Sequence, residues 1–179
     1  MTWKRKSLQS HGKYKIFEIF EEKLINPRND RTIDFFYLAL SDWTVVVPIT
    51  EDNQIVMIKQ FRVGAKKYFY EFPGGLIDEN EAPLQAAKRE LLEETGYSSD
   101  QFTLLTEIYP LPAFQTSKCF IYVAENVKFK EKISLDEGED IETLLMPFEK
   151  VKKMVKNNEL DNSVMMLAFL TYLFNRVTQ

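Results

Sequence analysis

The sequence has one histidine and one cysteine, and this scarcity excludes several kinds of catalytic site. His11 lies in a polar N-terminal stretch, so the body of the chain cannot assemble a Ser-His-Asp or Cys-His arrangement. A single histidine also cannot build a zinc site from several imidazoles. Cys119 has no partner for an internal disulfide, and its place in the apolar run CFIYVA predicts a small buried side chain. Because a lone cysteine suits a reducing compartment, we expect a cytoplasmic protein.

Glycine-rich phosphate-binding motifs and long apolar segments are also absent. The chain has neither G-x-x-x-x-G-K-[ST] nor G-x-G-x-x-G, which excludes a P-loop and a dinucleotide fingerprint. The N-terminal stretch MTWKRKSLQSHGK lacks the apolar core of a secretory signal, so we expect none. The longest uncharged apolar run, residues 162–175, is too short to span a bilayer and predicts a buried helix. We therefore expect no membrane partner.

Chain length and net charge limit the number of domains and the class of ligand. A chain of 179 residues suits one domain with a short extension and is long enough to bury a core. The net charge of -4 and a pI near 5.2 disfavour binding to a nucleic-acid backbone. If the ligand is nevertheless a polyanion such as a nucleotide, the protein needs metal cations to neutralise it.

The order of the predicted elements is strands first, one helix in the middle and helices at the end. Apolar runs bounded by turn residues predict strands at residues 14–20, 32–40, 44–49, 55–61, 68–72, 102–109, 119–123 and 143–146. Helical patterns occupy residues 84–95, 148–157 and 161–176, and Asp161 is a candidate N-cap of the last. This order predicts an α+β protein layered around a mixed β-sheet. We expect residues 1–42 to form a β-strand appendage and residues 43–179 the main domain.

The central helix is predicted by its end signals and its apolar stripe. Pro83 is tolerated in the first turn of a helix, and Gly96 is a natural C-terminal stop. At 100° per residue, one side of the helix collects three apolar side chains, namely Leu84, Ala87 and Leu91.

Three carboxylates, Glu90, Glu93 and Glu94, share a neighbouring face of this helix. Like charges at this spacing repel by roughly 0.2–0.5 kcal/mol per pair. A hard divalent cation, which takes oxygen ligands, would remove that repulsion. Arg89 stands four residues before Glu93 and can pair with it. The alternative is a well-solvated acidic face on an amphipathic helix.

A longer pattern of fixed residue types, which includes these glutamates, argues against a merely solvated acidic face. Fixed residue types occur at Gly75, Glu81, Arg89, Glu90, Glu93, Glu94 and Gly96, in the pattern G-x5-E-x7-R-E-x-x-E-E-x-G. At ordinary amino-acid usage, a chance match in a chain of this length has a probability on the order of one in a million. The pattern resembles the Nudix box, and the chain is similar to Nudix hydrolases.

The resemblance extends beyond the box. The segments TVVVPITEDNQIVMIKQFRVG and YEFPGGLID, together with Pro112 downstream, resemble the ADP-ribose pyrophosphatase branch of that family. The resemblance implies a Nudix fold, an α/β/α sandwich around a mixed β-sheet with a small N-terminal β appendage. It also implies a homodimer in which the appendage helps to complete the neighbouring site. The loop PLPAFQTSK lacks an acidic residue that ADP-ribose enzymes often have, so the identity of the sugar stays open.

The implied reaction is hydrolysis of the pyrophosphate bond of a nucleoside diphosphate sugar, with ADP-ribose as the leading substrate. The products would be a nucleoside monophosphate and a sugar phosphate. The resemblance implies Mg²⁺, with Mn²⁺ as a substitute, held by Glu90, Glu94 and the carbonyl of Gly74. Arg89 would orient the glutamates.

Four residues are candidates for substrate binding: Arg62, Glu71, Pro112 and Phe114. Arg62, at the end of a predicted strand, is a candidate contact for phosphate or ribose, and the alternative is a solvent-facing arginine. The nucleobase needs a flat partner, and the N-terminal appendage supplies several aromatic side chains.

The general base has two candidates. Glu93 is the simpler one, although pairing with Arg89 favours an anchoring role over proton transfer. The acidic loop LDEGED offers Glu137 as the base and Glu139 as a metal ligand once substrate is bound, and Gly138 lets that loop bend tightly. The alternative for the loop is a solvated turn.

Two other functions stay open at this point. One is a Nudix hydrolase of another nucleotide, such as a dinucleoside polyphosphate, a coenzyme A or a nucleoside triphosphate. The other is a catalytically silent Nudix-fold nucleotide sensor, against which the intact set of glutamates argues.

Overall fold

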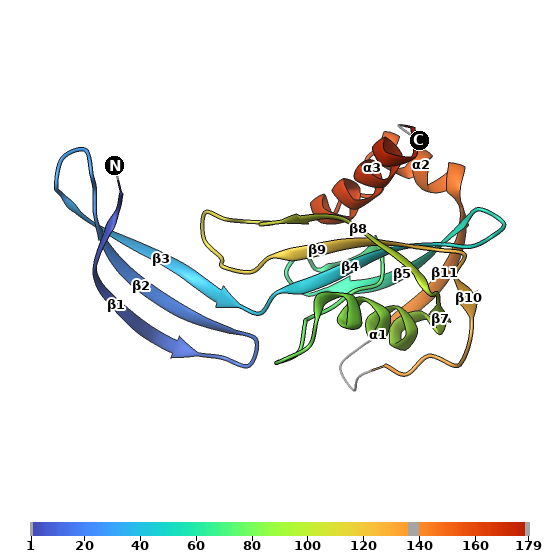
Figure 1. Cartoon of the computed structure of the whole chain (residues 1–179), viewed down its shortest axis with the longest axis horizontal. Coiled ribbons are helices and arrows are strands. Elements are labelled where there is room, and N and C mark those ends of the chain that lie inside the picture. The colour runs from blue at the N-terminus through green and yellow to red at the C-terminus, as the bar shows by residue number, and fades with distance from the viewer. Residues whose placement is uncertain (1, 136–139, 178–179) are drawn as a thin grey trace. The chain divides into compact units, whose positions relative to one another are not determined.

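The computed structural model describes residues 2–135 and 140–177 of the chain (Figure 1). The chain divides into two compact units. The first contains residues 1–42 and 109–118, and the second contains residues 43–108 and 119–179. The segment 109–118 therefore groups with the N-terminal strands.

The first unit is a three-stranded antiparallel sheet in the order β1-β2-β3. Its strands are β1 (Lys4–Lys13), β2 (Phe17–Ile25) and β3 (Thr32–Leu40). The segment 109–118 runs beside β3. There the Leu38 amide donates to the Phe114 carbonyl at 2.8 Å, and the Thr116 amide donates to the Leu38 carbonyl at 3.0 Å.

Strand β1 is missing from the sequence-based expectation, which places a strand at residues 14–20 instead. The stretch KRKSLQSHGK is exposed along almost its whole length, so it shows little apolar periodicity. It becomes a strand by pairing with β2, from Lys4 opposite Ile25 to Lys13 opposite Glu18. Tyr14 lies in the turn between the strands, where its amide donates to the Phe17 carbonyl at 2.7 Å. The expectation was wrong because pairing between strands, and not local pattern, creates β1.

The second unit is built on a mixed six-stranded sheet. Its main path runs β11-β5-β4-β9-β8, and β6 pairs with β5. Strands β4 and β9 are parallel, and the other pairings in this sheet are antiparallel. The strands are β4 (Trp43–Ile49), β5 (Gln54–Arg62), β6 (Lys67–Glu71), β8 (Gln101–Ile108), β9 (Cys119–Glu125) and β11 (Ile141–Pro147). Two short strands, β7 (Tyr97–Ser98) and β10 (Lys128–Phe129), pair with each other.

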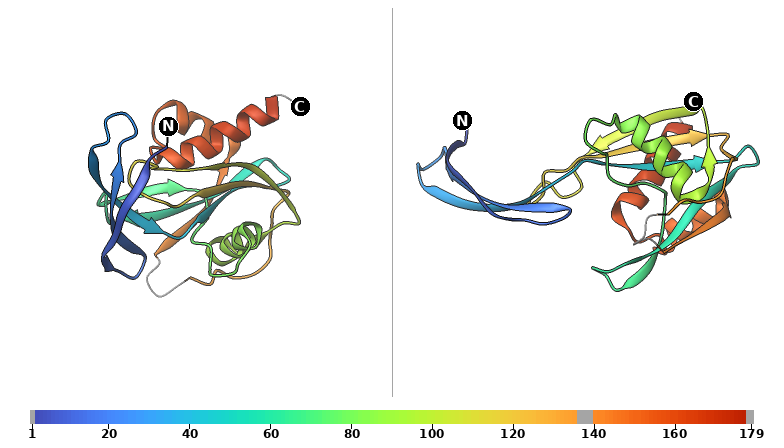
Figure 2. Two further views of the ribbon diagram at one scale, coloured as in Figure 1. Left: turned by 60° about the vertical axis from the view of Figure 1, so that its left-hand side comes forward. Right: turned by 90° about the horizontal axis from the view of Figure 1, so that it is seen from below.

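Helices cover both faces of this sheet (Figures 1 and 2). Helix α1 (Pro83–Thr95) packs on one face, and α2 (Phe148–Lys156) and α3 (Ser163–Val177) pack on the other. Strand β5 contributes side chains to the cores on both faces of the sheet. Val56 belongs to the core under α1, and Met57 belongs to the core under α2 and α3. The predicted α+β layering around a mixed sheet is confirmed.

The apolar run near the C-terminus and the single cysteine both lie in the interior. Ala168 and Phe169 of α3 have no exposed surface. Cys119 is buried on β9, and burial raises its pKa to about 12. None of the described helices is long and apolar enough to cross a membrane.

The start of α3 differs by one residue from the expected N-cap. Asn162 supplies the cap, because its Oδ1 accepts a hydrogen bond from the Val164 amide at 3.1 Å. Asp161 instead forms an ion pair with Lys67. Asn and Asp are both strongly favoured at N-caps, so the sequence alone does not choose between neighbours.

Gly96 offers a test of how α1 ends. Its φ is +74°, and a Cβ there would lie 2.2 Å from the Glu131 carbonyl oxygen. We predict that Gly96→Ala lowers the free energy of unfolding by at least about 1–2 kcal/mol, the usual cost of a left-handed alanine. Gly64→Ala is the matched control, because nothing lies within 4 Å of its Cβ position. Urea unfolding followed by circular dichroism compares the two, and similar midpoints would contradict the prediction.

Candidate active site

A cavity of about 290 Å³ opens beside α1 in the second unit. The described residues that line it come from the end of β5, the loop after β6 and the face of α1 that carries Glu90 and Glu94. They are Gln60, Arg62, Gly74, Gly75, Leu76, Asp78, Arg89, Glu90 and Glu94. Carboxylates, arginines and glycine backbone thus share one small space.

Helix α1 points two of its glutamates at this cavity. The helix begins at Pro83 and ends at Thr95, with Gly96 as its C-cap, as its end signals predict. Its apolar side packs on the sheet, and Ala87 and Leu91 are fully buried. That packing turns Glu90 and Glu94 toward the cavity, whereas the Glu93 side chain is 44% exposed and lies outside the described lining. The predicted acidic face is therefore divided between the cavity and solvent.

Arg89 is the hub of the surrounding carboxylates. Its Nε and Nη2 donate to the two oxygens of Glu81 at 3.0 and 2.9 Å. Its Nη2 also donates to the Leu76 carbonyl at 3.0 Å, and its Nη1 donates to Glu90 at 2.8 Å and Glu93 at 3.1 Å. The hydrogen bonds from Arg89 hold the pKa of Glu81 below its usual value. The predicted pair with Glu93 is present, and the two-pronged contact is made with Glu81.

The double glycine lets the loop approach both the sheet and α1. The buried Glu94 accepts a hydrogen bond at Oε2 from the Gly74 amide at 2.8 Å. A Cβ on Gly74 would lie 2.1 Å from the Thr44 carbonyl oxygen, and one on Gly75 would lie 2.5 Å from Glu90 Oε1. Side chains at either position would collide with backbone or displace Glu90.

The donor chemistry of the cavity fits a hard divalent cation in part. Within the described parts of the chain, no group of three His, Cys, Asp or Glu side chains is placed to hold a metal ion. Two carboxylates, Glu90 and Glu94, and the loop at Gly74 do line one space. A magnesium-like ion commonly binds through one or two carboxylates and takes its other ligands from water and substrate phosphates. The residues present suit a cation of that kind.

Arg62 is held at the cavity by a buried carboxylate. Glu71 has no exposed surface. Arg62 Nε donates to both Glu71 oxygens at 3.2 and 3.0 Å, and Nη2 donates to Oε2 at 2.6 Å. Asn162 Nδ2 donates to Glu71 Oε1 at 2.9 Å. A buried carboxylate is stable only when it is paired, and Arg62 and Asn162 supply the partners of Glu71. Through these contacts Glu71 connects Arg62 to the start of α3.

Apart from Glu71 and Glu93, whose places are given above, the predicted site residues fall in three places. Five of them line the cavity, namely Arg62, Gly74, Arg89, Glu90 and Glu94. Pro112 and Phe114 belong to the first unit, in the segment beside β3. Glu137 and Glu139 lie outside the described residues.

Three polar residues at or beside the cavity were not predicted as site residues, namely Gln60, Asp78 and Asn162. Gln60 stands two positions before Arg62 on β5, so strand alternation starting from Arg62 would have found it. Asn162 reaches Glu71 from 91 positions along the chain, and no local signal reports that contact.

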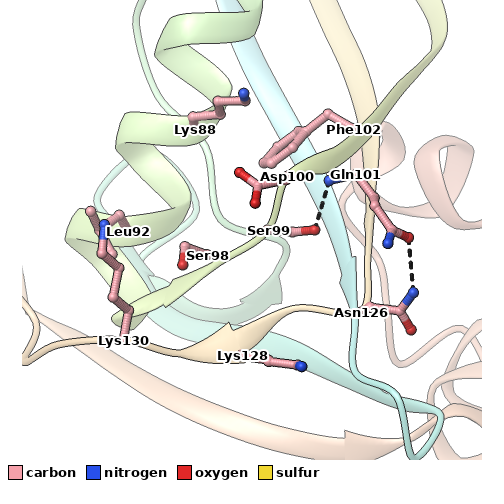
Figure 3. A pocket seen from close by; sticks show the side chains of 10 residues that line it. All are labelled: Lys88, Leu92, Ser98, Ser99, Asp100, Gln101, Phe102, Asn126, Lys128 and Lys130. Carbon is pink, nitrogen blue, oxygen red and sulfur yellow. Dashed lines mark hydrogen bonds between the residues drawn. The ribbon is translucent and has the colours of Figure 1, made fainter.

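A second cavity, of about 450 Å³, lies beside α1, β7 and β8 (Figure 3). Its described lining contains three lysines, Lys88, Lys128 and Lys130, and one carboxylate, Asp100. Figure 3 shows the Lys128 side chain pointing away from Asp100. A space with a single carboxylate among lysines is poorly suited to a divalent cation. The smaller cavity, with Glu90 and Glu94, is therefore the candidate active site.

Oxygen donors beside arginines suit a metal-assisted reaction of a phosphorylated ligand. The family model described as NUDIX domain matches residues 40–168. The chain belongs to the Nudix family, whose hydrolases generally require a divalent metal. The resemblance read from the box is confirmed.

Similar proteins include two from Bacillus. The chain is 35% identical to the ADP-ribose pyrophosphatase of Bacillus subtilis (strain 168), over 64% of this chain and 62% of that protein. It is 32% identical to the methanol dehydrogenase activator of Bacillus methanolicus, over 69% of this chain and 67% of that protein. The crystal structure of an ADP compounds hydrolase matches with a TM-score of 0.85 at 22% identity, covering 96% of this chain and 92% of that one. The structural match confirms the predicted Nudix fold.

The bridge from Asn162 to Glu71 generates a prediction about pH. Asn162→Asp keeps a favoured N-cap residue but places a carboxylate against Glu71. Two adjacent carboxylates repel each other when both are charged, so the folded protein loses more stability at a pH where both are ionised than at a lower pH. We predict that Asn162→Asp lowers the free energy of unfolding by about 1–3 kcal/mol at pH 8 and by less at pH 5.

Asn162→Ser is the control, because serine also caps helices but does not carry a charge. Asn162→Ser should lower the free energy of unfolding by about 1 kcal/mol with little dependence on pH. Urea unfolding at both pH values measures the two variants. Equal losses for Asn162→Asp at pH 5 and pH 8 would show that its side chain does not face Glu71.

Proposed function

We propose that this chain hydrolyses the pyrophosphate bond of a nucleoside diphosphate sugar, with ADP-ribose as the leading substrate. The products are a nucleoside monophosphate and a sugar phosphate. The observation that carries the proposal is the cavity in which Glu90 and Glu94 lie together beside the Arg89 hub. Membership of the Nudix family and the likeness to the Bacillus subtilis ADP-ribose pyrophosphatase support it.

The proposed cation is Mg²⁺, with Mn²⁺ as a substitute. Glu90, Glu94 and the carbonyl of Gly74 are its proposed ligands. When bound, the cation neutralises the bridging phosphates and stabilises the leaving phosphate. Arg62 contacts a phosphate or the ribose, and Glu71 acts on the substrate through Arg62, which it holds from a fully buried position.

A carboxylate must take the proton from the attacking water. Glu93 and Glu137 are the proposed candidates. Glu93 accepts a hydrogen bond from Arg89 at 3.1 Å, which favours an anchoring role. We therefore favour Glu137 as the base and Glu139 as a further metal ligand once substrate is bound.

The organic part of the substrate needs apolar contacts. Pro112 and Phe114 are proposed to supply them, and the Phe114 side chain is 44% exposed. The single cysteine and the net charge of -4 support a cytoplasmic enzyme whose partner is a nucleotide sugar, with no nucleic-acid or membrane partner.

The substrate class is tested by a panel assay. ADP-ribose, GDP-mannose, a dinucleoside polyphosphate, coenzyme A and a nucleoside triphosphate are each incubated with the protein and Mg²⁺. Released phosphomonoester is then measured. We expect the nucleotide sugars to react fastest. Preference for another nucleotide would reassign the substrate, and no turnover with any of them would indicate a sensor.

Substitution of the cavity glutamates tests the metal site. We predict that Glu90→Gln and Glu94→Gln each lower kcat/KM by about 10² or more, because each removes a charged ligand while keeping its shape. Chelator should abolish activity in the unmodified protein. Glu79→Gln is the control, since Glu79 is an exposed carboxylate on the adjacent loop. Full turnover in excess chelator would contradict a metal-dependent mechanism.

We also propose that the first unit mediates a homodimer. The register places Glu21 opposite Phe36 and Glu22 opposite Phe35, so these neighbouring phenylalanines occupy opposite faces of the sheet. Phe36 is 59% exposed and Phe35 is 39% exposed. A three-stranded sheet needs a further apolar surface to be stable, and a second copy of this chain supplies one. In that dimer the appendage helps to complete the neighbouring subunit's site.

Phe36→Lys tests the dimer. We predict that it converts a dimer into a monomer, because it places a charge in an interface expected to bury more than about 1,200 Å². Val63→Lys is the matched control, as Val63 is 80% exposed on the β5–β6 turn of the second unit. Light scattering after size exclusion gives the mass of each. A wild-type monomer, or a Phe36→Lys dimer as stable as wild type, would remove this face from the interface.

A further inference from the structure

One buried side-chain oxygen at the cavity has no hydrogen-bond partner among the described residues. Across residues 2–135 and 140–177, Gln60 Oε1 is the one buried side-chain nitrogen or oxygen without a hydrogen bond. Gln60 lines the same cavity as Glu90 and Glu94. Buried acceptors in folded proteins nearly always have a donor, because an unpaired one costs free energy. A donor that belongs to no described residue is therefore expected at this position.

The position of Gln60 on β5 explains why it faces the cavity. Alternate residues of a strand share a face, so Gln60 follows Val56 and Ile58 on the side covered by α1. Val56 and Ile58 are fully buried and apolar. The same face becomes polar at Gln60, where the strand leaves the core and reaches the cavity. An apolar side chain would have continued the core at this position without an unpaired acceptor.

The neighbours of Gln60 do not satisfy its carbonyl oxygen. Its cross-strand partners are Phe69 on β6 and Ile141 on β11, whose side chains carry no donor. The two arginines that line the cavity are directed elsewhere. Arg62 donates to Glu71, and Arg89 donates to glutamates and to a loop carbonyl.

We propose that Gln60 is a ligand-binding residue whose Oε1 accepts a hydrogen bond from an O–H group that enters the cavity. Two sources supply such a group, namely a water molecule held by the divalent cation and a hydroxyl of the nucleotide sugar. The proposal rests on the proposed function for the identity of these sources. It goes beyond that function by assigning a role to a neutral residue that supplies neither charge nor a metal ligand.

Gln60→Met tests the proposal, because methionine is similarly long and unbranched but lacks the carbonyl acceptor. Two effects of opposite sign are expected. The melting temperature of the metal-free protein should rise by about 2–4 °C, since an unpaired buried acceptor is removed. Affinity for the ligand that supplies the O–H group should fall about tenfold. Gln54→Met on the same strand is the control, because the Gln54 side chain already has a partner within the protein: its Nε2 donates to Asp52 Oδ2 at 2.7 Å.

Two binding measurements distinguish the sources. Titration with Mn²⁺ alone, followed by electron paramagnetic resonance, reports a cation-bound water. Calorimetric titration with ADP-ribose in the presence of chelator, which prevents turnover, reports a substrate hydroxyl. A tenfold loss in either titration, together with the higher melting temperature, supports the proposal and names the source.

Unchanged affinities in both titrations overturn the proposal. A lower melting temperature for metal-free Gln60→Met also overturns it, because the carbonyl oxygen would then already have a partner within the protein. None of these readouts depends on turnover. If the wild-type protein hydrolyses no nucleotide sugar, the proposed function fails, while the Mn²⁺ titration and the melting temperature still decide the role of Gln60.

Discussion

The contacts of one guanidinium, that of Arg89, organise the site. Arg89 donates to Glu81, Glu90 and Glu93 and to the carbonyl of Leu76, so it ties the glycine loop to α1. These carboxylates would otherwise repel one another around a small cavity. The contacts, that with Glu81 first, raise the pKa of Arg89, and they hold the pKa of Glu81 below its usual value. A cation added to this arrangement meets carboxylates that are already oriented.

The rest of the site is built from polar groups buried around that hub. Glu94 is held by the Gly74 amide, and Glu71 is held by Arg62 and Asn162. The Gly74 contact links the glycine loop to α1, and the Asn162 contact links the start of α3 to the end of β6, so both helical layers support residues at the cavity. Buried polar groups of this kind lower stability unless they are paired. Among these groups, Gln60 Oε1 has no partner in the described part of the chain, and for this reason we assign it to ligand binding.

Local signals in the sequence were enough to predict the layered fold, α1 and the residues of the box. Pro83 and Gly96 bound the helix where expected, and Glu90 and Glu94 share a cavity as their spacing implies. What local patterns missed depends on distant pairing. Strand β1 exists only because β2 lies beside it, and the role of Asn162 appears only when α3 is packed against the end of β6. The roles of Glu137 and Glu139 stay predictions.

Anomalous diffraction from crystals grown with Mn²⁺ tests most directly whether Glu90 and Glu94 hold the cation. We predict a single strong peak in the cavity of about 290 Å³, within about 2.5 Å of a carboxylate oxygen of both residues. The Gly74 carbonyl should face the same peak. No peak at saturating Mn²⁺, or a peak only beside Asp100 in the other cavity, would contradict the assignment of this site.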